Sequence, residues 1–338
     1  MDRETVTSTA VGLATAALVF GVMFWLVDTD AVLAAAGRAD LALLAVVGLT
    51  ILLWNAAWGL ALWTVLASLS IPVAAHRAVL IHAAGAFVNH VTPLGQAGGE
   101  PVTAWLLSRS ADTDYEVGLA SVASLDAINV LPSVTFAICG LTYILVTRTF
   151  GSGTRVLLAG TAAVAVGLPV LGALAWRHRR NADSVVAGVV DRVGQPLARV
   201  VPRLTAPHPD DIAERVRRFV EALEAVTADR RRLGTAISYS ALGWSLQAVG
   251  LWVAFLALDA AIPLYVPFFV VPIGTMASVL PTPGGLGGIE AVNVTVITLI
   301  TGVGAATVAV AVTIHSVGGY LLTTTVGAAA ASALGVRT

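Results

Sequence analysis

Six long apolar segments restrict this chain to a bundle of membrane-spanning helices. A helix needs about 20 apolar residues to cross a bilayer, and each segment is near or above that length: residues 10–27, 41–69, 118–146, 156–176, 234–258 and 305–334. Composition agrees, because 57% of the residues are hydrophobic and only 12% are charged, against about a quarter charged in soluble domains. We predict an all-α polytopic membrane protein that forms one membrane domain over residues 1–338.

A short frame occurs once in each half of the chain and interrupts apolar sequence both times. The frame T-P-x-G-x-x-G-x-E covers residues 92–100 and 282–290. Proline and repeated glycine end helices, because one lacks a donor and the other is conformationally loose. Each frame therefore predicts a break between two helical pieces. The expected pieces are residues 72–90 and 100–109 in the first pair, and 263–280 and 290–302 in the second.

The match between the two regions extends beyond the frames. Trp54 and Trp244 precede the threonine of their frame by the same distance along the chain, and Ile71-Pro72 matches Ile262-Pro263 with a shift of one residue. We therefore predict two repeats, at about 41–147 and 234–334. One odd span at 156–176 lies between them, so the second repeat starts on the opposite membrane face. The prediction is an inverted repeat with two broken or re-entrant helix pairs, comprising about six full spans and two re-entrant hairpins.

Residues 177–233 form a polar loop that holds twelve of the nineteen arginines. The positive-inside rule places this loop in the cytoplasm. Tracing outward then places both termini in the cytoplasm of a plasma-membrane protein, with residues 10–27 as a retained first span. After Asp210, an expected N-cap, apolar residues recur at helical spacing and predict one amphipathic helix. Its arginines either attract anionic headgroups or only set the topology of a solvated connector.

The two frames carry the expected chemistry. A backbone break inside a bilayer leaves unpaired amides and carbonyls, so it survives only beside protein or water. Helix N-termini attract anionic groups, and glycine lets such groups approach the backbone. The carboxylates Glu100 and Glu290 either occupy a favourable first helical turn or are ionisable groups on a substrate or proton path. The predicted pathway residues are Thr92, Pro93, Gly95, Gln96, Gly98, Gly99, Glu100, Thr282, Pro283, Gly285, Gly287, Gly288 and Glu290.

Five further polar residues are secondary pathway candidates. Asp126 and Asn129 are three residues apart and share a helix face, where they either line the cavity or bond to another helix. His315 lies close to the position that matches Asp126 and is either a proton relay or a satisfied buried histidine. Asn89 and His90 directly precede the first frame. The histidine spacings do not favour a metal cluster, so we expect neither metal nor cofactor.

The frames resemble the two signature regions of the lysylphosphatidylglycerol synthase transmembrane, or flippase-like, family. The stretches that carry the resemblance are 93–101 and 281–290, and the resemblance extends over about residues 10–335. In that family the domain occurs alone or attached to lipid-modifying enzymes, and it is thought to move modified lipids between leaflets. This chain resembles the stand-alone form. Many members have a basic residue shortly after the first glutamate, where this chain has Thr103. A composition that lacks lysine and uses arginine and aspartate would suit a halophilic archaeon, and high genomic GC content alone would also explain it.

Three functions follow from these features. The first is a lipid translocator, proton-coupled through its carboxylates, that moves a lipid with a polar or anionic headgroup. The second is a membrane partner of a lipid-modifying enzyme of aminoacyl-lipid or lipid-linked glycan synthesis. The third is an ion or small-solute carrier. The chain lacks H-E-x-x-H and G-x-S-x-G motifs, so we expect no catalysis by the chain itself. A net charge of -1 argues against nucleic-acid binding.

Overall fold

The computed structural model of the chain describes residues 36–92, 96–147, 209–275 and 286–334, together with Ala34 and Gly167. Over these residues the regular elements are all helices, as predicted. Four helices are long and apolar enough to cross a membrane, namely α3 (Leu41–Ser68), α6 (Tyr115–Thr147), α10 (Arg230–Leu256) and α13 (Ala305–Ala333). They correspond to four of the six predicted spans. The other two, residues 10–27 and 156–176, lie outside the described residues except for Gly167.

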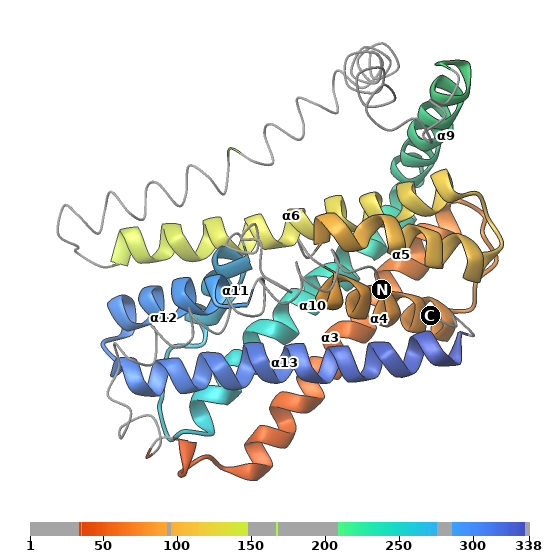
Figure 1. The fold of residues 1–338 in the computed structure, drawn as a ribbon. Helices are drawn as coiled ribbons and strands as arrows, with labels where there is room; N and C mark the ends of the chain where they lie inside the picture. Colours follow the sequence, from red (N-terminus) through yellow and green to blue (C-terminus); the bar gives the residue numbers. More distant parts are fainter. Residues whose placement is uncertain are drawn as a thin grey trace, which may run out of the picture.

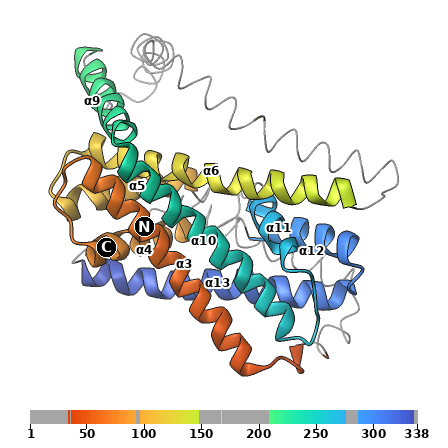
Figure 2. The same cartoon turned by 180° about the vertical axis from the view of Figure 1, so that it is seen from behind.

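Four shorter helices form the two interrupted pairs. They are α4 (Ala75–Val91) and α5 (Gln96–Ala111) around the first frame, and α11 (Tyr265–Thr275) and α12 (Gly288–Thr301) around the second. The longest, α4, has 17 residues, so it spans about 25 Å, less than the roughly 30 Å of bilayer hydrocarbon. Figures 1 and 2 show α4 and α5 at the end of the bundle that carries α9, with α11 and α12 toward the other end.

The start of α5 corrects one prediction. The expected boundary at Glu100 is wrong, because α5 begins at Gln96 and includes the paired glycines of the frame. Gly99 packs directly under Asn89 of α4, at a place where a Cβ atom would overlap the Asn89 side chain. Tertiary packing at this close approach outweighs the low helix propensity of glycine.

The predicted amphipathic helix is present as α9 (Pro209–Ala228). Asp210 does not cap it, because the helix already begins at Pro209, and proline is well suited to a first helical position. Ala222 and Val226 are buried, and Val226 belongs to a small apolar cluster with residues of α3, α6 and α10. An ion pair of 3.2 Å between Arg218 and Asp114 ties α9 to the start of α6.

Helices α3 and α10 run antiparallel along the centre of the bundle (Figures 1 and 2). At one end, the Asp40 amide, just before α3, donates to the Ala257 carbonyl, just after α10, at 2.8 Å. At the other end, Arg232 Nη1 of α10 donates to the Ala67 carbonyl of α3. Each helix also begins with an aspartate N-cap, Asp40 for α3 and Asp229 for α10. The two ends of this helix pair are therefore built alike.

The remaining helix contacts occur in matched sets. When α3 to α6 are paired in order with α10 to α13, each contact has a counterpart. Thus α4 packs against α13, and α11 packs against α6, so each short helix contacts the long helix of the other half. A tryptophan hydrogen bond also recurs in both halves. Trp63 Nε1 donates to the Val73 carbonyl at 3.1 Å, and Trp252 Nε1 donates to the Ile262 carbonyl at 3.1 Å. In each case the acceptor lies ten residues after the tryptophan.

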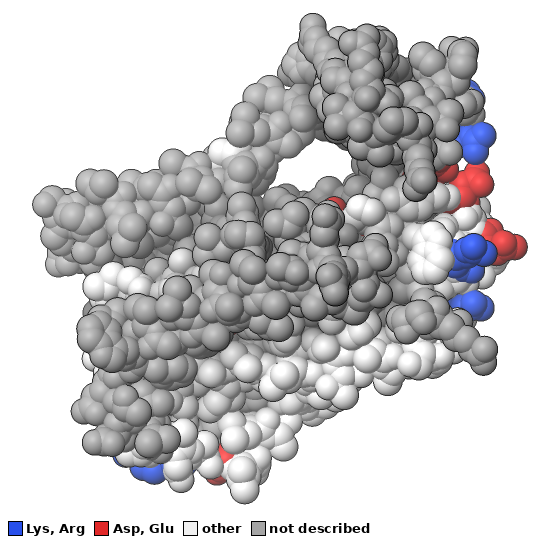
Figure 3. Space-filling view, in the orientation of Figure 1, with Lys and Arg blue, Asp and Glu red and all other residues white. Residues whose placement is uncertain are grey.

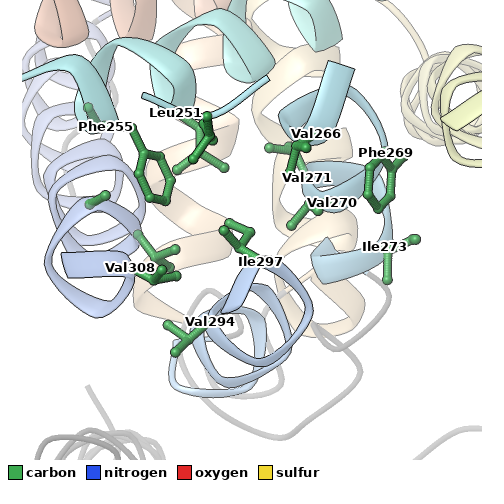
Figure 4. Close-up of a cluster of buried hydrophobic side chains, with 14 of the residues drawn as sticks. Leu251, Phe255, Val266, Phe269, Val270, Val271, Ile273, Val294, Ile297 and Val308 are labelled. Atoms are coloured by element: carbon green, nitrogen blue, oxygen red, sulfur yellow. The ribbon is translucent and has the colours of Figure 1, made fainter. Parts of the chain in front are cut away.

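The apolar core and the charged surface fit a membrane setting. Figure 4 shows side chains of α10, α11, α12 and α13, among them Phe255, Phe269 and Ile297, converging in the largest apolar cluster. These three side chains are fully buried, and truncating such a side chain to alanine costs about 3 to 5 kcal/mol. Figure 3 shows the described charged residues gathered mainly at the end that carries α9, with a smaller group at the opposite end.

Candidate functional site

Three carboxylic acids of the membrane helices lie at the two frames or in the interior of a long helix. They are Glu100 of α5, Asp126 of α6 and Glu290 of α12. Within the described helices, arginine occurs only in first or last turns, at α4, α5 and α10, or in the peripheral helix α9. Ionisable side chains within a bilayer are expensive and mark functional sites by default. The described interior of the bundle is thus acidic.

Glu100 and Asp126 form a carboxyl pair. Their side chains lie close together across the α5–α6 contact, near enough for each to influence the ionisation of the other. Both residues are partly buried. Two ionised carboxylates repel each other and can only accept hydrogen bonds, so the close approach is favourable only when one partner carries a proton. The sequence singled out both residues but did not predict that they meet.

Glu290 is fully buried at the start of α12. Its Oε2 atom accepts a hydrogen bond of 2.5 Å from the Gly287 amide, so it occupies the first-turn position that was one of the two predicted alternatives. Gly287 itself has a φ of 90°, a conformation that favours glycine. Glu290 Oε1 has no hydrogen-bond partner among the described residues. Within this part of the chain, one buried oxygen at the second frame is therefore unpaired.

The matching position of Asp126 in the second half is Ser316, not His315. Ser316 follows Glu290 at the same distance along the chain as Asp126 follows Glu100. Ser316 lies next to Glu290, close enough to influence its ionisation, although its hydroxyl donates to the Val312 carbonyl at 2.8 Å. The two frame glutamates thus face equivalent positions of α6 and α13. One position holds a carboxyl group and the other a hydroxyl group.

His315 belongs to a different part of the bundle. It is buried, and its ring lies 5.5 Å from that of Trp54, centroid to centroid. It also lies close to the backbone of Gln247, and its Nε2 atom has no hydrogen-bond partner among the described residues. Trp54 is only 8% exposed, so its ring is part of the protein core. Packing of α3 against α13 has placed both rings inside.

His90 joins the end of α4 to α13. Its Nδ1 atom lies 2.8 Å from Thr324 Oγ1, and its ring stacks on Tyr320 at 4.3 Å. The Tyr320 hydroxyl donates to the His90 carbonyl at 3.1 Å. Since the Thr324 hydroxyl donates to the Tyr320 carbonyl, its oxygen accepts from Nδ1–H. These contacts fix the last turn before the first frame against the other half of the chain.

Asn129 makes the interhelical bonds that were its structural alternative. Its Oδ1 atom accepts from the Ser240 hydroxyl at 2.6 Å, and its carbonyl accepts from Trp244 Nε1 at 3.0 Å. These bonds fasten α6 to α10. Asp126, one helical turn earlier, points its carboxyl group to Glu100 instead. The shared helix face of the two residues therefore serves two different contacts.

The remaining described frame residues lie at the end of α4 or in the first turns of α5 and α12. Thr92 caps α4, and its hydroxyl donates to the Val88 carbonyl at 2.7 Å. Gln96 and Gly98 are in the first turn of α5, and Gly288 begins α12. The residues Pro93, Gly95, Thr282, Pro283 and Gly285 lie outside the described part of the chain.

Matched glycines bring the helices of each pair together. Gly85 of α4 faces Thr103 of α5, where an added Cβ atom would lie 2.5 Å from the Thr103 methyl group. Gly274 of α11 faces Asn293 of α12, where a Cβ atom would overlap Oδ1. Thr103 and Asn293 occupy equivalent positions, because each follows the glutamate of its own frame by three residues. Small residues permit such close helix approach in membranes.

Sequence reasoning missed Ser316, Asn293, Tyr320 and Thr324. Extending the alignment of the two frames further along the chain would have found Ser316 and Asn293. No sequence signal identifies Tyr320 or Thr324, because their contacts with His90 depend on how α4 meets α13. No group of three or more potential metal ligands occurs among the described residues.

Comparison with known proteins gives consistent matches. The family model described as the lysylphosphatidylglycerol synthase TM region matches residues 9–327. A UPF0104 membrane protein of Methanothermobacter thermautotrophicus is 27% identical over 83% of this chain and 79% of its own length. A second from that organism is 26% identical over 62% of this chain and 61% of its own length, and one from Pyrococcus horikoshii is 23% identical over 72% of each.

No solved structure matches the chain. The family match covers most of the sequence, including both frames, the helices α3 to α6 and α10 to α12, and α13 up to residue 327. The chain therefore belongs to the family of the lysylphosphatidylglycerol synthase transmembrane region.

Proposed function

We propose that this protein moves lipids with polar headgroups between the two leaflets of the plasma membrane. The observation that carries the proposal is the pair of buried or partly buried frame glutamates, each at the start of a short interrupted helix and each facing the same position of a long helix. Helix N-termini and intramembrane carboxyl groups together provide polar partners for a headgroup. The hydrocarbon chains would stay in the bilayer. The protein itself would catalyse no reaction.

The arrangement of the helices supports an inverted repeat. The equivalent helices α3 and α10 are antiparallel, and the other contacts occur in matched sets. Two halves of opposite orientation would bring their broken helices in from opposite membrane faces, as in many secondary transporters. The arginines at the start of α10 would mark the cytoplasmic face, with both termini on that side.

The acidic residues inside the bundle determine which headgroup charge the site favours. A headgroup that carries an ammonium group would complement Glu100, Asp126 and Glu290 directly. An anionic headgroup would approach the same helix N-termini only when the carboxyl groups are neutral. Binding of an anionic lipid would therefore be accompanied by proton uptake, which is the basis of the proposed proton coupling.

The test uses purified protein in liposomes with a panel of labelled lipids that differ in headgroup charge. Expected results are protein-dependent movement of at least one lipid class and its loss in the double variant Glu100→Gln with Asp126→Asn. The matched control is Ser316→Ala, which alters the equivalent site of the second half without removing a carboxyl group. Absence of movement for every headgroup, or full pH-dependent movement in the double variant, would refute the proposal.

A cation carrier is the second candidate, since the Glu100–Asp126 pair could hold a cation in place of its proton. Stabilisation against heat by sodium, lost in Asp126→Asn, would favour this candidate. A membrane partner of a lipid-modifying enzyme would instead show lipid movement or modification only when that enzyme is added.

A further inference from the structure

A groove of about 400 Å³ opens between the last turns of α6 and the first turn of α11. Its lining includes Phe136, Cys139, Gly140 and Tyr143 of α6, and Tyr265 and Phe268 of α11. Apart from two phenol groups and one thiol, these side chains are apolar. Cys139 and Tyr143 are exposed, so the groove opens sideways from helices that lie in the membrane.

Aromatic pairs hold the two helices apart around one close contact. The rings of Phe136 and Phe268 meet edge to face with centroids 5.4 Å apart, and those of Tyr143 and Tyr265 do so at 4.7 Å. Between them, Gly140 lies against Phe269, where a Cβ atom would overlap. The helices thus touch at the glycine and separate at the aromatic rings. This geometry creates the groove.

The equivalent interface in the other half, between α4 and α13, has a different lining. When the two frames are aligned, Tyr265 and Phe268 correspond to Ala75 and Ala78, and Cys139 and Tyr143 correspond to Ala329 and Ala333. Ala78 is fully buried. Gly327 of α13 packs directly onto Ala83 and Phe87 of α4. The repeat architecture therefore does not require aromatic residues here, and the lining is particular to the α6–α11 interface.

The position of the groove indicates its occupant. It lies at the end of the bundle opposite the arginines of α10, because α6 ends and α11 begins there (Figure 1). Residues 136–143 cover about 10 Å of helix, or about a third of the bilayer hydrocarbon. Tyrosine is enriched at membrane interfaces, and Tyr143 is nearest the end of α6. The groove therefore leads from the interface into the hydrocarbon.

We propose that this groove binds one hydrocarbon chain of a membrane lipid, whose headgroup lies at the tyrosine end, in the leaflet opposite the arginine-rich face. A lipid chain fits the apolar lining, the sideways opening and the depth. The site is separate from the two frames. It would hold a lipid whether or not the protein moves lipids between leaflets, so its test is independent of translocation.

The experiment uses the full chain in lipid nanodiscs that contain a lipid with a photoreactive diazirine in one acyl chain. After irradiation, peptide mapping locates the attached lipid. The expected result is labelling concentrated on residues 136–143 and 264–268. Cys139→Phe, which fills the groove, should lower that labelling about fivefold, equivalent to roughly 1 kcal/mol. The matched control Ile138→Phe adds the same ring at a neighbouring residue that is 38% exposed and outside the lining, and should leave the labelling unchanged.

Two results would overturn the proposal. One is uniform labelling of all exposed faces of α6 that Cys139→Phe does not reduce. The other is crosslinking of Cys139, the single cysteine of the chain, to residues 10–27 or 156–176, which would show that an apolar segment of the protein fills the groove. Thermal unfolding of both variants checks that they fold. Lipid movement is measured in parallel, so groove labelling without movement would refute translocation alone, and movement without groove labelling would refute this site alone.

Discussion

The two halves of the protein share a geometry but differ in chemistry at the positions that face the frame glutamates. In the first half, Glu100 meets a carboxyl group, Asp126, and both are partly open. In the second half, Glu290 is fully buried and accepts a hydrogen bond from the Gly287 amide at the start of its own helix. It lies beside the hydroxyl group of Ser316. The contrast teaches that duplicated helix positions can keep their packing while their roles diverge. We infer that Glu100 takes part in proton binding, whereas the main role of Glu290 is to stabilise the start of α12.

The largest effect should come from removing the sealed glutamate. Glu290→Ala would leave a cavity and an unpaired Gly287 amide, and should reduce the free energy of unfolding by about 3 kcal/mol. Glu100→Ala, at a partly exposed position, should cost about 1 kcal/mol. Reversible unfolding in mixed micelles measures both. Equal decreases in the free energy of unfolding for the two variants would show that the two glutamates do not differ in their structural roles.

The second-largest effect on stability should come from Gly85 and Gly274, the glycines at the contact between the two short helices of each pair. Gly274→Ala and Gly85→Ala each force a Cβ atom against the facing helix. The overpacking should lower the free energy of unfolding by about 1 to 2 kcal/mol, even after the gain from the higher helix propensity of alanine is subtracted. Asn293→Ala removes the side chain that faces Gly274, so it should restore stability only to Gly274→Ala. Thr103→Ser removes the methyl group that faces Gly85, so it should restore stability only to Gly85→Ala. Double-mutant cycles on unfolding give these coupling energies. Rescue of either variant by the partner from the other half would show that the assigned contacts are incorrect.

The carboxyl pair should determine how transport depends on pH. If the carboxyl groups of Glu100 and Asp126 share one proton during transport, a rise in pH removes it and leaves two negative charges facing each other. Wild-type transport of an anionic lipid should therefore slow by about tenfold or more toward alkaline pH, equivalent to roughly 1.4 kcal/mol. Asp126→Asn supplies a permanent donor and should flatten the profile. Ser316→Ala should keep the wild-type profile, and a flat profile in that variant would contradict the division of roles.

The smallest effects should be equal in the two halves. Trp63→Phe and Trp252→Phe each remove one indole donor from a carbonyl ten residues along, at a cost of about 1 kcal/mol for each hydrogen bond. Unfolding of the two variants should therefore give the same loss within error. A difference of more than about 1 kcal/mol between them would show that these contacts are not equivalent.

Much of the helical layout follows from local sequence. The apolar segments at 41–69, 118–146, 234–258 and 305–334 match α3, α6, α10 and α13 closely, because a membrane-spanning segment must satisfy its own backbone. The start of α5 and the start of α9 were misplaced by four residues or fewer. Helix ends depend on contacts such as that of Asn89 with Gly99, which local propensity does not contain.

The sequence by itself determined that the chain is an all-helical membrane protein of this family, with two glycine-rich breaks and a carboxyl group at each. Tertiary structure alone decided which groups those carboxyls meet: Asp126 for Glu100, and Ser316 with the Gly287 amide for Glu290. It also decided that His315 packs on Trp54 and that α6 and α11 leave a groove between them. The physical reason is that bilayer solvation acts on each segment separately, whereas partner choice depends on how helices distant in sequence pack.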